Sequence, residues 1–259
     1  ELGDGGRGLG IDLPLHQPQE LLTMANAILG QDQLSLAKYL WIASAGDDPK
    51  LDINDIASFF GHILRRVDWA RDLHFQTQTT IDTLDYSGPA MHRGSKLVVA
   101  AVGPPRRELP QSCSQELFAD LAAVAKHRFC IPGILALSLK GGGIQDLLDA
   151  LPHDHPSRQF PLWVVSDDAD FTGQSLANLL WETFTRSDPA SDTYGYQSQT
   201  VSKHWGCQAP LVIDATSKPH HAPKLVEDPA LLEQVARRWG AKGQPLQPPV
   251  QQPGADRSR

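Results

Sequence analysis

Two similar segments recur along this chain, each in the same sequence context. RVDWARD, residues 66–72, and RSDPASD, residues 186–192, are identical at four of seven positions. A bulky run of strand type precedes each segment and another follows it: LWIAS at 40–44 and LWVVS at 162–166, then LVVAA at 97–101 and LVIDA at 211–215. The offsets between partners are 122, 120 and 114 residues, so the copies differ by small insertions that loops tolerate. The sequence therefore predicts a duplicated unit with the order strand, helix, strand, strand.

The spacing of apolar residues predicts the elements of the first copy. A one-sided apolar pattern predicts a helix over residues 17–29, and KYLWIAS, residues 38–44, is typical of a strand. A second helix, capped by Asp52 or Asn54, should bury a face that includes Ile63 and end at RVDWARD. Two strands should follow it, and the second copy should repeat this order.

Three further elements are expected between the copies. SQELFADLAAVAKH, residues 114–127, has the pattern of a helix, and RFCIPGILALSL, residues 128–139, reads as a strand broken at Pro132 and Gly133. IQDLLDAL, residues 144–151, predicts a short helix. Strands that alternate with helices predict an α/β fold, here two tandem copies of a βαββ-type unit with mixed sheets covered by helices.

The end of the chain contains one more helix and a polar tail. In DPALLEQVARRWG, Asp228 is a good N-cap, Pro229 suits the first helical position and Gly240 ends the helix. We expect five segments: a linker or cut point over 1–12, a first unit over 13–105, a connecting helix and strand over 106–160, a second unit over 161–242 and a disordered Gln/Pro-rich tail over 243–259.

Composition narrows the class of protein. The 259 residues have a net charge of −7 with scattered basic residues, which argues against a nucleic-acid surface. The three cysteines are odd in number and widely spaced, so a disulfide framework is not expected and a reducing cytoplasm fits best. No apolar run approaches the roughly 20 residues needed to span a bilayer, and no signal-peptide pattern opens the chain.

The repeated segment has a structural and a chemical interpretation. Arg66 and Arg186 would stand in the last turn of a helix, where a cation complements the helix dipole. The Asp, Pro and Ala residues that follow suit the turn into the next strand. A direct chemical role for either arginine is the alternative.

Two glycine-rich stretches are candidate phosphate sites. GDGGRG matches the dinucleotide-binding spacing at Gly3, Gly5 and Gly8, but neither a strand before it nor a helix after it is expected, which favours a linker. KGGGIQDLLDAL, from Lys140, could present backbone N–H groups to an anion between a strand and a helix. It lacks the GK[ST] signature, so a plain loop is the alternative.

Carboxylates and histidines supply the other candidates. SDDAD at 166–170 and GDD at 46–48 stand at strand ends, where carboxylates could hold a hard cation or could cap helices and fill turns. Four histidines in proline-flanked loops lack metal-binding spacing and are expected to face solvent: His153, His155, His220 and His221. No nucleophile elbow or Cys/His arrangement appears, so the residues alone predict a scaffold without a catalytic centre.

Together these motifs resemble the C-terminal domain of the UbiD family of prenylated-FMN-dependent decarboxylases. The matching segments run from about Gly10 to Trp239: LTMANAILGQDQLSLAKYLWIAS, RRVDWARD, IDTLDYSGP, GSK, LVIDATSKP and EDPALLEQVARRW. The duplication is similar to a long form of the family with two C-terminal units, associated with menaquinone or ubiquinone biosynthesis. This chain departs from the family pattern because GSK stands in the first copy and IDATSK in the second. The first copy also has SAGDD where an acidic run is usual.

The resemblance implies little chemistry for these residues themselves. In this family the Glu-Arg-Glu catalytic set, and the groups that hold a divalent metal and the flavin phosphate, belong to an N-terminal domain that nothing here matches. One cofactor contact carries over: Lys38 in LSLAKYL would reach the flavin near its phosphate, with an ordinary exposed lysine as the alternative. The second copy has Phe160 or Pro161 at the equivalent place, so it should not bind flavin in that way.

The resemblance therefore implies the C-terminal part of a UbiD-like carboxy-lyase that decarboxylates an aromatic or unsaturated acid. This part would form a homo-oligomer and close over an active site built by an N-terminal flavin-binding domain, and it would be inactive alone. The alternative is a stand-alone assembly or small-molecule-binding module. A third possibility, a nucleotide-binding enzyme, would need the loop at 141–143 to hold phosphate.

Overall fold

The structure is a computed structural model that describes residues 18–222 and 228–240. The chain divides into two units, residues 1–220 and 221–259. The second unit contains helix α7 (Pro229–Gly240), and Asp228 caps it as predicted, because its Oδ1 accepts the Ala230 N–H at 2.9 Å. The segments expected to be a linker (1–12) and a tail (243–259), with the GDGGRG glycines, lie outside the described residues.

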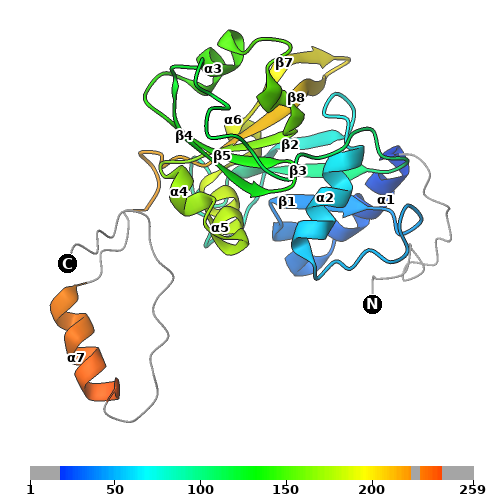
Figure 1. Cartoon of the computed structure of the whole chain (residues 1–259). Helices are drawn as coiled ribbons and strands as arrows, with labels where there is room; N and C mark the ends of the chain where they lie inside the picture. The colour runs from blue at the N-terminus through cyan, green and yellow to red at the C-terminus, as the bar shows by residue number, and fades with distance from the viewer. Residues whose placement is uncertain (1–17, 223–227, 241–259) are drawn as a thin grey trace. The chain divides into compact units, whose positions relative to one another are not determined.

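The first sheet has three strands and two helices close to it (Figure 1). Its elements are α1 (Pro18–Leu29), a 3₁₀ turn (Asp32–Leu36), β1 (Tyr39–Ala43), α2 (Ile56–Arg66), β2 (Leu73–Thr79) and β3 (Gly94–Ala101). The strand order is β1-β3-β2, with β1 parallel and β2 antiparallel to β3. Parallel neighbours need a crossover, which the α2–β2 segment provides.

The second sheet has five strands, in the order β4-β5-β6-β8-β7. Its elements are β4 (Val124–Ile131), β5 (Ile134–Leu139), α3 (Ile144–Ala150), a 3₁₀ turn (Pro156–Gln159), β6 (Leu162–Val165), α4 (Ala169–Thr172), α5 (Leu176–Arg186), α6 (Pro189–Asp192), β7 (Thr193–Val201) and β8 (His204–Asp214). β5, β6 and β8 are mutually parallel neighbours, whereas the outer strands β4 and β7 are antiparallel. The predicted α/β class with mixed sheets is confirmed.

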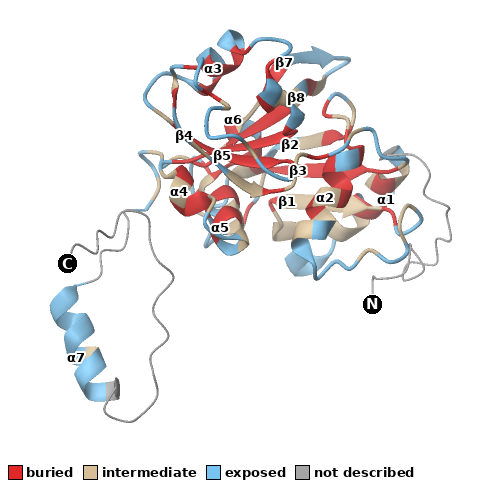
Figure 2. Cartoon of the chain, viewed as in Figure 1, coloured by how far each residue is buried: buried red, intermediate tan, exposed pale blue. Residues whose placement is uncertain are grey.

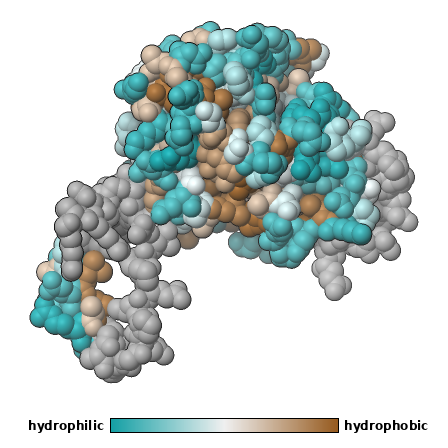
Figure 3. Space-filling view, in the orientation of Figure 1, coloured by the Kyte–Doolittle hydropathy of each residue, from teal (hydrophilic) through white to brown (hydrophobic). Residues whose placement is uncertain are grey.

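One hydrophobic core is shared by the two sheets. β3 is buried on both faces: Val98 and Ala100 pack with Leu21 of α1, while Leu97 and Val99 point into the larger core. That core also contains Leu211 of β8 and further buried side chains of α2, β6 and α5. Figure 2 shows these strands as the most buried part of residues 18–220, and Figure 3 shows a hydrophobic strip between hydrophilic surfaces on one face. Each sheet thus shares one face with this common core, while a separate cluster that includes Leu137 and Trp163 covers the other face of the second sheet.

Two local predictions were wrong. Residues 114–123 form turns instead of a helix, and Val124–Ile131 is the edge strand β4, which pairs with β5. The N-cap of α2 is Asp55, whose Oδ1 accepts the Ser58 N–H at 3.1 Å. Asp52 instead accepts the Asn54 N–H at 2.8 Å in the preceding turn.

The break predicted inside residues 128–139 is confirmed as a tight hairpin between β4 and β5. Gly133 has φ +85°, a conformation that glycine adopts without the steric cost of a Cβ atom. The predicted short helix is confirmed as α3.

Candidate functional site

Lys38 lies immediately before β1 and is 8% exposed. Its Nζ donates to the Ser87 hydroxyl at 2.6 Å and lies 2.8 Å from Asp85 Oδ2. Burial lowers the pKa of Lys38, and the neighbouring Asp85 carboxylate opposes that effect. The lysine is thus an enclosed cation with a defined carboxylate partner, rather than an ordinary exposed one.

The partners of Lys38 come from the connection between β2 and β3, which carries the IDTLDYSGP motif. Asp85 Oδ1 accepts hydrogen bonds from both the backbone N–H and the hydroxyl of Ser87, at 2.9 and 2.6 Å. His220 Nε2 donates to the Ser87 carbonyl at 3.1 Å. The loop between β2 and β3 therefore binds the Lys38 ammonium, and His220 contacts that loop in turn.

The GSK motif contacts the second repeated segment. Ser95 donates its backbone N–H and its hydroxyl to Asp188 Oδ1, each at 2.8 Å, and the same hydroxyl accepts the Ala190 N–H. Lys96 Nζ donates to the Ala37 carbonyl at 3.1 Å, and burial lowers its pKa. Gly94, Ser95 and Lys96 thus join the segment before β1 to the turn after α5.

The lysine of the IDATSK motif has a comparable environment. Lys218 Nζ donates to the carbonyls of Asp214 and Arg186, at 2.6 and 3.1 Å. It also lies 3.4 Å from Asp192 Oδ1 and 3.5 Å from Asp214 Oδ1. The lysines of the three motifs are therefore all bound to groups of the chain itself.

The two repeated segments form the same turn. Asp72 Oδ2 accepts the Asp68 N–H at 2.8 Å, and Asp192 Oδ2 accepts the Asp188 N–H at 2.6 Å. In each turn the last aspartate also donates its own N–H to the carbonyl four residues earlier, at 2.8 Å. The carboxylates thus close the turn between helix and strand, which confirms the structural interpretation of these aspartates.

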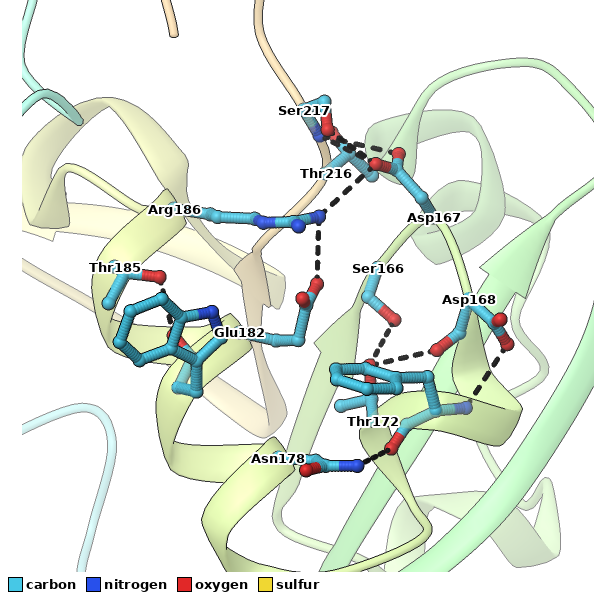
Figure 4. A network of polar contacts seen from close by, with 12 residues as sticks. Ser166, Asp167, Asp168, Thr172, Asn178, Glu182, Thr185, Arg186, Thr216 and Ser217 are labelled. Carbon is cyan, nitrogen blue, oxygen red and sulfur yellow. Dashed lines mark hydrogen bonds and ion pairs between the residues drawn. The ribbon is translucent and has the colours of Figure 1, made fainter. Parts of the chain in front are cut away.

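The arginine that opens each segment points toward an acidic group. Arg186 Nη1 lies 2.8 Å from Glu182 Oε2 and 3.3 Å from Asp167 Oδ2, between the two carboxylates (Figure 4). Asp167 in turn accepts the backbone N–H of Ser217 at 3.2 Å. Arg66 Nε lies 3.8 Å from Asp47 Oδ2, which accepts the Gly103 N–H at 2.9 Å.

The carboxylates considered as metal ligands are used in other ways. Asp168 caps α4, while Asp170 binds Lys126 and Arg128. Asp48 accepts the Lys50 N–H at 3.0 Å. Over residues 18–222 and 228–240 no group of three or more His, Cys, Asp or Glu side chains is arranged to hold a metal ion.

In the glycine loop before α3, the amide next to the helix is already bound within the chain. The Gly143 N–H donates to Asp146 Oδ2 at 2.8 Å, so a carboxylate of the helix itself occupies that position. A plain strand-to-helix loop is the better interpretation.

The histidines divide between surface and interior. His153 and His220 are exposed, as predicted, and His221 is half-buried. For His155 the prediction was wrong, because it is buried, with Nδ1 hydrogen-bonded to Ser157 and Nε2 3.1 Å from Asp120. A hydrophilic loop sequence did not reveal that Phe118 packs against this ring.

Comparison with known proteins assigns a family to the first part of the chain. Residues 9–101 match the family described as 3-octaprenyl-4-hydroxybenzoate carboxy-lyase C-terminal domain. A protein of Chlamydia pneumoniae, described as one of the subunits of a 4-hydroxybenzoate decarboxylase, is 33% identical over 224 residues, which cover 86% of this chain and 37% of that protein. An uncharacterized protein of Chlamydia muridarum is 32% identical over 222 residues, with 85% and 37% coverage. The chain thus spans little more than a third of the curated relatives it matches.

Solved structures show a more remote likeness. Sedimentibacter hydroxybenzoicus vanillic acid decarboxylase in its closed form is 14% identical, with a TM-score of 0.34 over 65% of this chain and 44% of that chain. A dimeric form of the UbiD-class enzyme HmfF from Pelotomaculum thermopropionicum, in complex with prFMN, has 14% identity and a TM-score of 0.31 over 62% and 43%. On the family match, residues 9–101 belong to the C-terminal domain of the UbiD family, and the chain is similar along 86% of its length to a curated decarboxylase subunit.

Proposed function

We propose that this chain is the C-terminal part of a UbiD-like carboxy-lyase that removes CO₂ from an aromatic or unsaturated acid in quinone biosynthesis. The observation that carries the proposal is the 33% identity to a decarboxylase subunit along 86% of the chain. Because the match covers 37% of that relative, the reaction itself is assigned to the assembled enzyme. A prenylated flavin would supply the electron sink for decarboxylation there.

We also propose that the two βαββ-type units arose by duplication. The strand orders β1-β3-β2 and β6-β8-β7 support this, since each places a parallel pair beside an antiparallel strand. The matching turns closed by Asp72 and Asp192 support it too. Each copy's turn contacts the other copy: Asp188 binds Ser95, and the Cys207 N–H donates to the Trp69 carbonyl at 3.2 Å.

The role of these units in the enzyme would be to close over a flavin-binding domain and to assemble the oligomer. The connection between β2 and β3 offers apolar side chains for this contact, since Leu84, Tyr86 and Met91 are 79%, 59% and 69% exposed. Exposed apolar side chains gathered on one loop favour burial against a partner. The loop also holds Asp85 and Ser87 against Lys38, so closure would bring the partner to that lysine.

The residues around Lys38 do not make a flavin-phosphate site by themselves. Asp85 already occupies one side of the ammonium, and Asp188 and Asp192 also act on its charge. A phosphate dianion bound to Lys38 would be repelled by the Asp85 carboxylate, which is unfavourable in a buried setting. Most of the positive charge for the phosphate would therefore come from the partner domain, with Lys38 contributing its remaining N–H.

Native mass spectrometry of this chain, alone and mixed with an N-terminal flavin-binding half from the same source, tests the proposal. We expect a complex that retains flavin, and weaker flavin retention in Lys38→Ala, which removes one donor to the phosphate. Lys140→Ala, at an exposed lysine, is the matched control and should retain flavin. Lys38→Met, which keeps the apolar stem, separates loss of the cation from loss of packing.

The opposite result would support the alternative function. An isolated oligomer that ignores the flavin-binding half would indicate a stand-alone assembly module. Release of CO₂ by this chain with flavin but without the second half would contradict the expectation that it is inactive alone.

A further inference from the structure

β1 is an outer strand with the sequence of an inner one. It pairs with β3 on one side, and no strand of residues 18–222 pairs with its other edge. All five of its residues, YLWIA, are hydrophobic and half-buried (Figure 2). Charged residues or bulges commonly protect a sheet edge: β4 carries Lys126 and Arg128, and β2 and β7 contain register shifts. β1 has neither form of protection.

The backbone groups on the free edge of β1 have no partner. The Leu97 N–H donates to the Lys38 carbonyl at 3.0 Å, so the even-numbered residues of β1 face β3 in this parallel pair. The N–H and C=O groups of Tyr39, Trp41 and Ala43 therefore point to the opposite side. None of the described residues hydrogen-bonds to them there. Such a row of unpaired groups is a template on which another strand can add.

The equivalent strand of the second copy, β6, has a neighbour on both sides. Tyr39 stands opposite Leu97 of β3, and Leu162 stands opposite Leu211 of β8. Tyr39 therefore corresponds to Leu162, one residue away from the match of LWIAS with LWVVS. On its other side β6 pairs with the parallel strand β5, and all four residues of β6 are buried.

The hydrogen bonds between β5 and β6 show which groups of β1 a strand would use. The Leu162 N–H donates to the Gly133 carbonyl at 3.2 Å, and the Ser166 N–H donates to the Leu137 carbonyl at 2.9 Å. Ala43 occupies the position of Ser166. Its N–H has the corresponding direction but no acceptor among the described residues. The first copy thus has the donors of this ladder and lacks the strand.

The elements before the two strands also correspond. In the second copy the order is β5, α3, a 3₁₀ turn and β6, and in the first it is α1, a 3₁₀ turn and β1. α1 packs with Leu40 and Ile42 of β1, as α3 packs with Trp163 and Val165 of β6. The counterpart of β5 would therefore stand before α1 in a longer protein.

The source of that strand can be argued from the sequence and the relatives. Residues 1–17 are rich in glycine, which is depleted in strands. The curated decarboxylase subunit of Chlamydia pneumoniae matches this chain over only 37% of its own length. Most of such a protein therefore lies outside the matched region, and in the proposed function that remainder includes the flavin-binding half.

We propose that the free edge of β1 binds a parallel β-strand of the flavin-binding half, in the way that β6 binds β5. The strand would accept the N–H groups of Tyr39, Trp41 and Ala43 and donate to their carbonyls. Its side chains would be mainly aliphatic, as in ILALSL of β5, because they would lie between α1 and the shared core. The inference rests on the proposed duplication and on the proposed function, and it adds a contact to that of the β2–β3 connection.

Hydrogen exchange of single backbone amides, measured for the chain alone and mixed with the flavin-binding half, tests this. In the chain alone the amides of Tyr39, Trp41 and Ala43 should exchange rapidly. The Leu162 amide, which is bonded to Gly133, should exchange slowly. In the complex the three β1 amides should slow by at least about tenfold, while the Leu162 amide should not change.

Ala43→Pro is the variant that blocks the edge. The Ala43 N–H points away from β3, so proline leaves the ladder with β3 intact, removes a donor to the incoming strand and fills its space. The variant should still fold, which urea unfolding checks, and its affinity for the flavin-binding half should fall at least about tenfold in calorimetry. Ala43→Ser keeps the N–H and has the residue of the second copy, so this matched control should bind like the unchanged chain.

The outcomes separate this inference from the proposed function. A complex in which the β1 amides exchange as fast as in the free chain would overturn the β1 contact and leave the proposed function in place. Absence of any complex would contradict both, since the flavin-binding half is the proposed source of the strand. Slow exchange at Tyr39, Trp41 and Ala43 in the chain alone would show that this chain covers its own edge, and the inference would be wrong.

Discussion

Asp188 accepts two hydrogen bonds from Ser95, one from its backbone N–H and one from its hydroxyl, each at 2.8 Å. The two residues lie 93 positions apart and both are buried. Through this pair, the turn that follows α5 is bound to the first residues of β3.

Asp188→Ala should therefore destabilise the fold strongly. It leaves two buried donors of Ser95 and the Ser191 hydroxyl without their acceptor, which should cost about 3 kcal/mol of unfolding free energy. Urea denaturation measures the change. Ser95→Ala removes one donor and the acceptor of the Ala190 N–H, and should cost about 2 kcal/mol. Asp154→Ala, at an exposed position, should change little. Equal losses in the Asp188 and Asp154 variants would show that the pair does not stabilise the fold.

Gly206→Ala should be destabilising for a steric reason. A Cβ at Gly206 would lie 2.6 Å from Ala70 Cα and 2.8 Å from the carbonyl oxygens of Trp69 and Ala70. These are backbone atoms that cannot rotate away, so we expect a loss of about 3 kcal/mol in thermal or urea unfolding.

Gly61→Ala is the matched glycine substitution. Gly61 lies inside α2, and the nearest atom to an added Cβ is 4.0 Å away. Alanine in this helix should stabilise the protein by about 1 kcal/mol. We expect the unfolding free energy to fall in Gly206→Ala and to rise in Gly61→Ala. A change in the same direction for both variants would contradict the packing argument.

Trp69 and Trp163 are both buried but differ in hydrogen bonding, so substitutions at the two positions measure the effect of one hydrogen bond. Both indoles are fully buried, but Trp69 Nε1 donates to the Pro161 carbonyl at 2.9 Å, whereas Trp163 Nε1 has no hydrogen-bond partner among the described residues. Trp69→Phe should therefore cost about 1 kcal/mol more than Trp163→Phe in denaturant unfolding. The reverse order would contradict this assignment.

Asp85 should make the free energy of unfolding depend on pH in the acidic range. Burial tends to raise its pKa, but hydrogen bonds from Lys38 and Ser87 outweigh burial and hold the pKa below the ordinary value of 3.8. A carboxyl whose pKa is lower in the folded state stabilises the fold above its unfolded pKa, and this contribution is lost as pH falls through the folded pKa.

Asp85→Asn tests that dependence. The difference in unfolding free energy between the unchanged chain and this variant should be largest above about pH 5 and should shrink as pH falls below about 4. Denaturant unfolding over this range measures it. A difference that stays constant with pH would show that the Lys38–Asp85 pair is not responsible.

Elements with a strong local signal could be predicted from the sequence. α1, α2, α5 and α7 have one-sided apolar faces and clear ends, and β1, β3 and β6 are bulky runs. Residues 114–127 show where this fails: their spacing suits a helix, yet pairing with β5 makes Val124–Ile131 a strand. Pairing with β5 in a long hairpin outweighed the helical preference of these residues. The local sequence pattern does not reveal such pairing.

The environment of Lys38 could not be predicted in the same way. Its position came from a family resemblance, but its partners Asp85 and Ser87 lie almost 50 residues away in a loop.

The shared core has a consequence for synthesis of the chain. Leu97 of β3 and Leu211 of β8 belong to one hydrophobic cluster, and β8 lies between β6 and β7 in its sheet. When the ribosome has made only the first copy, the face of β3 that will meet the second copy has only α2 and the turn after it as partners. The nascent first copy therefore exposes apolar surface until β8 emerges, and it would need protection from aggregation during that interval.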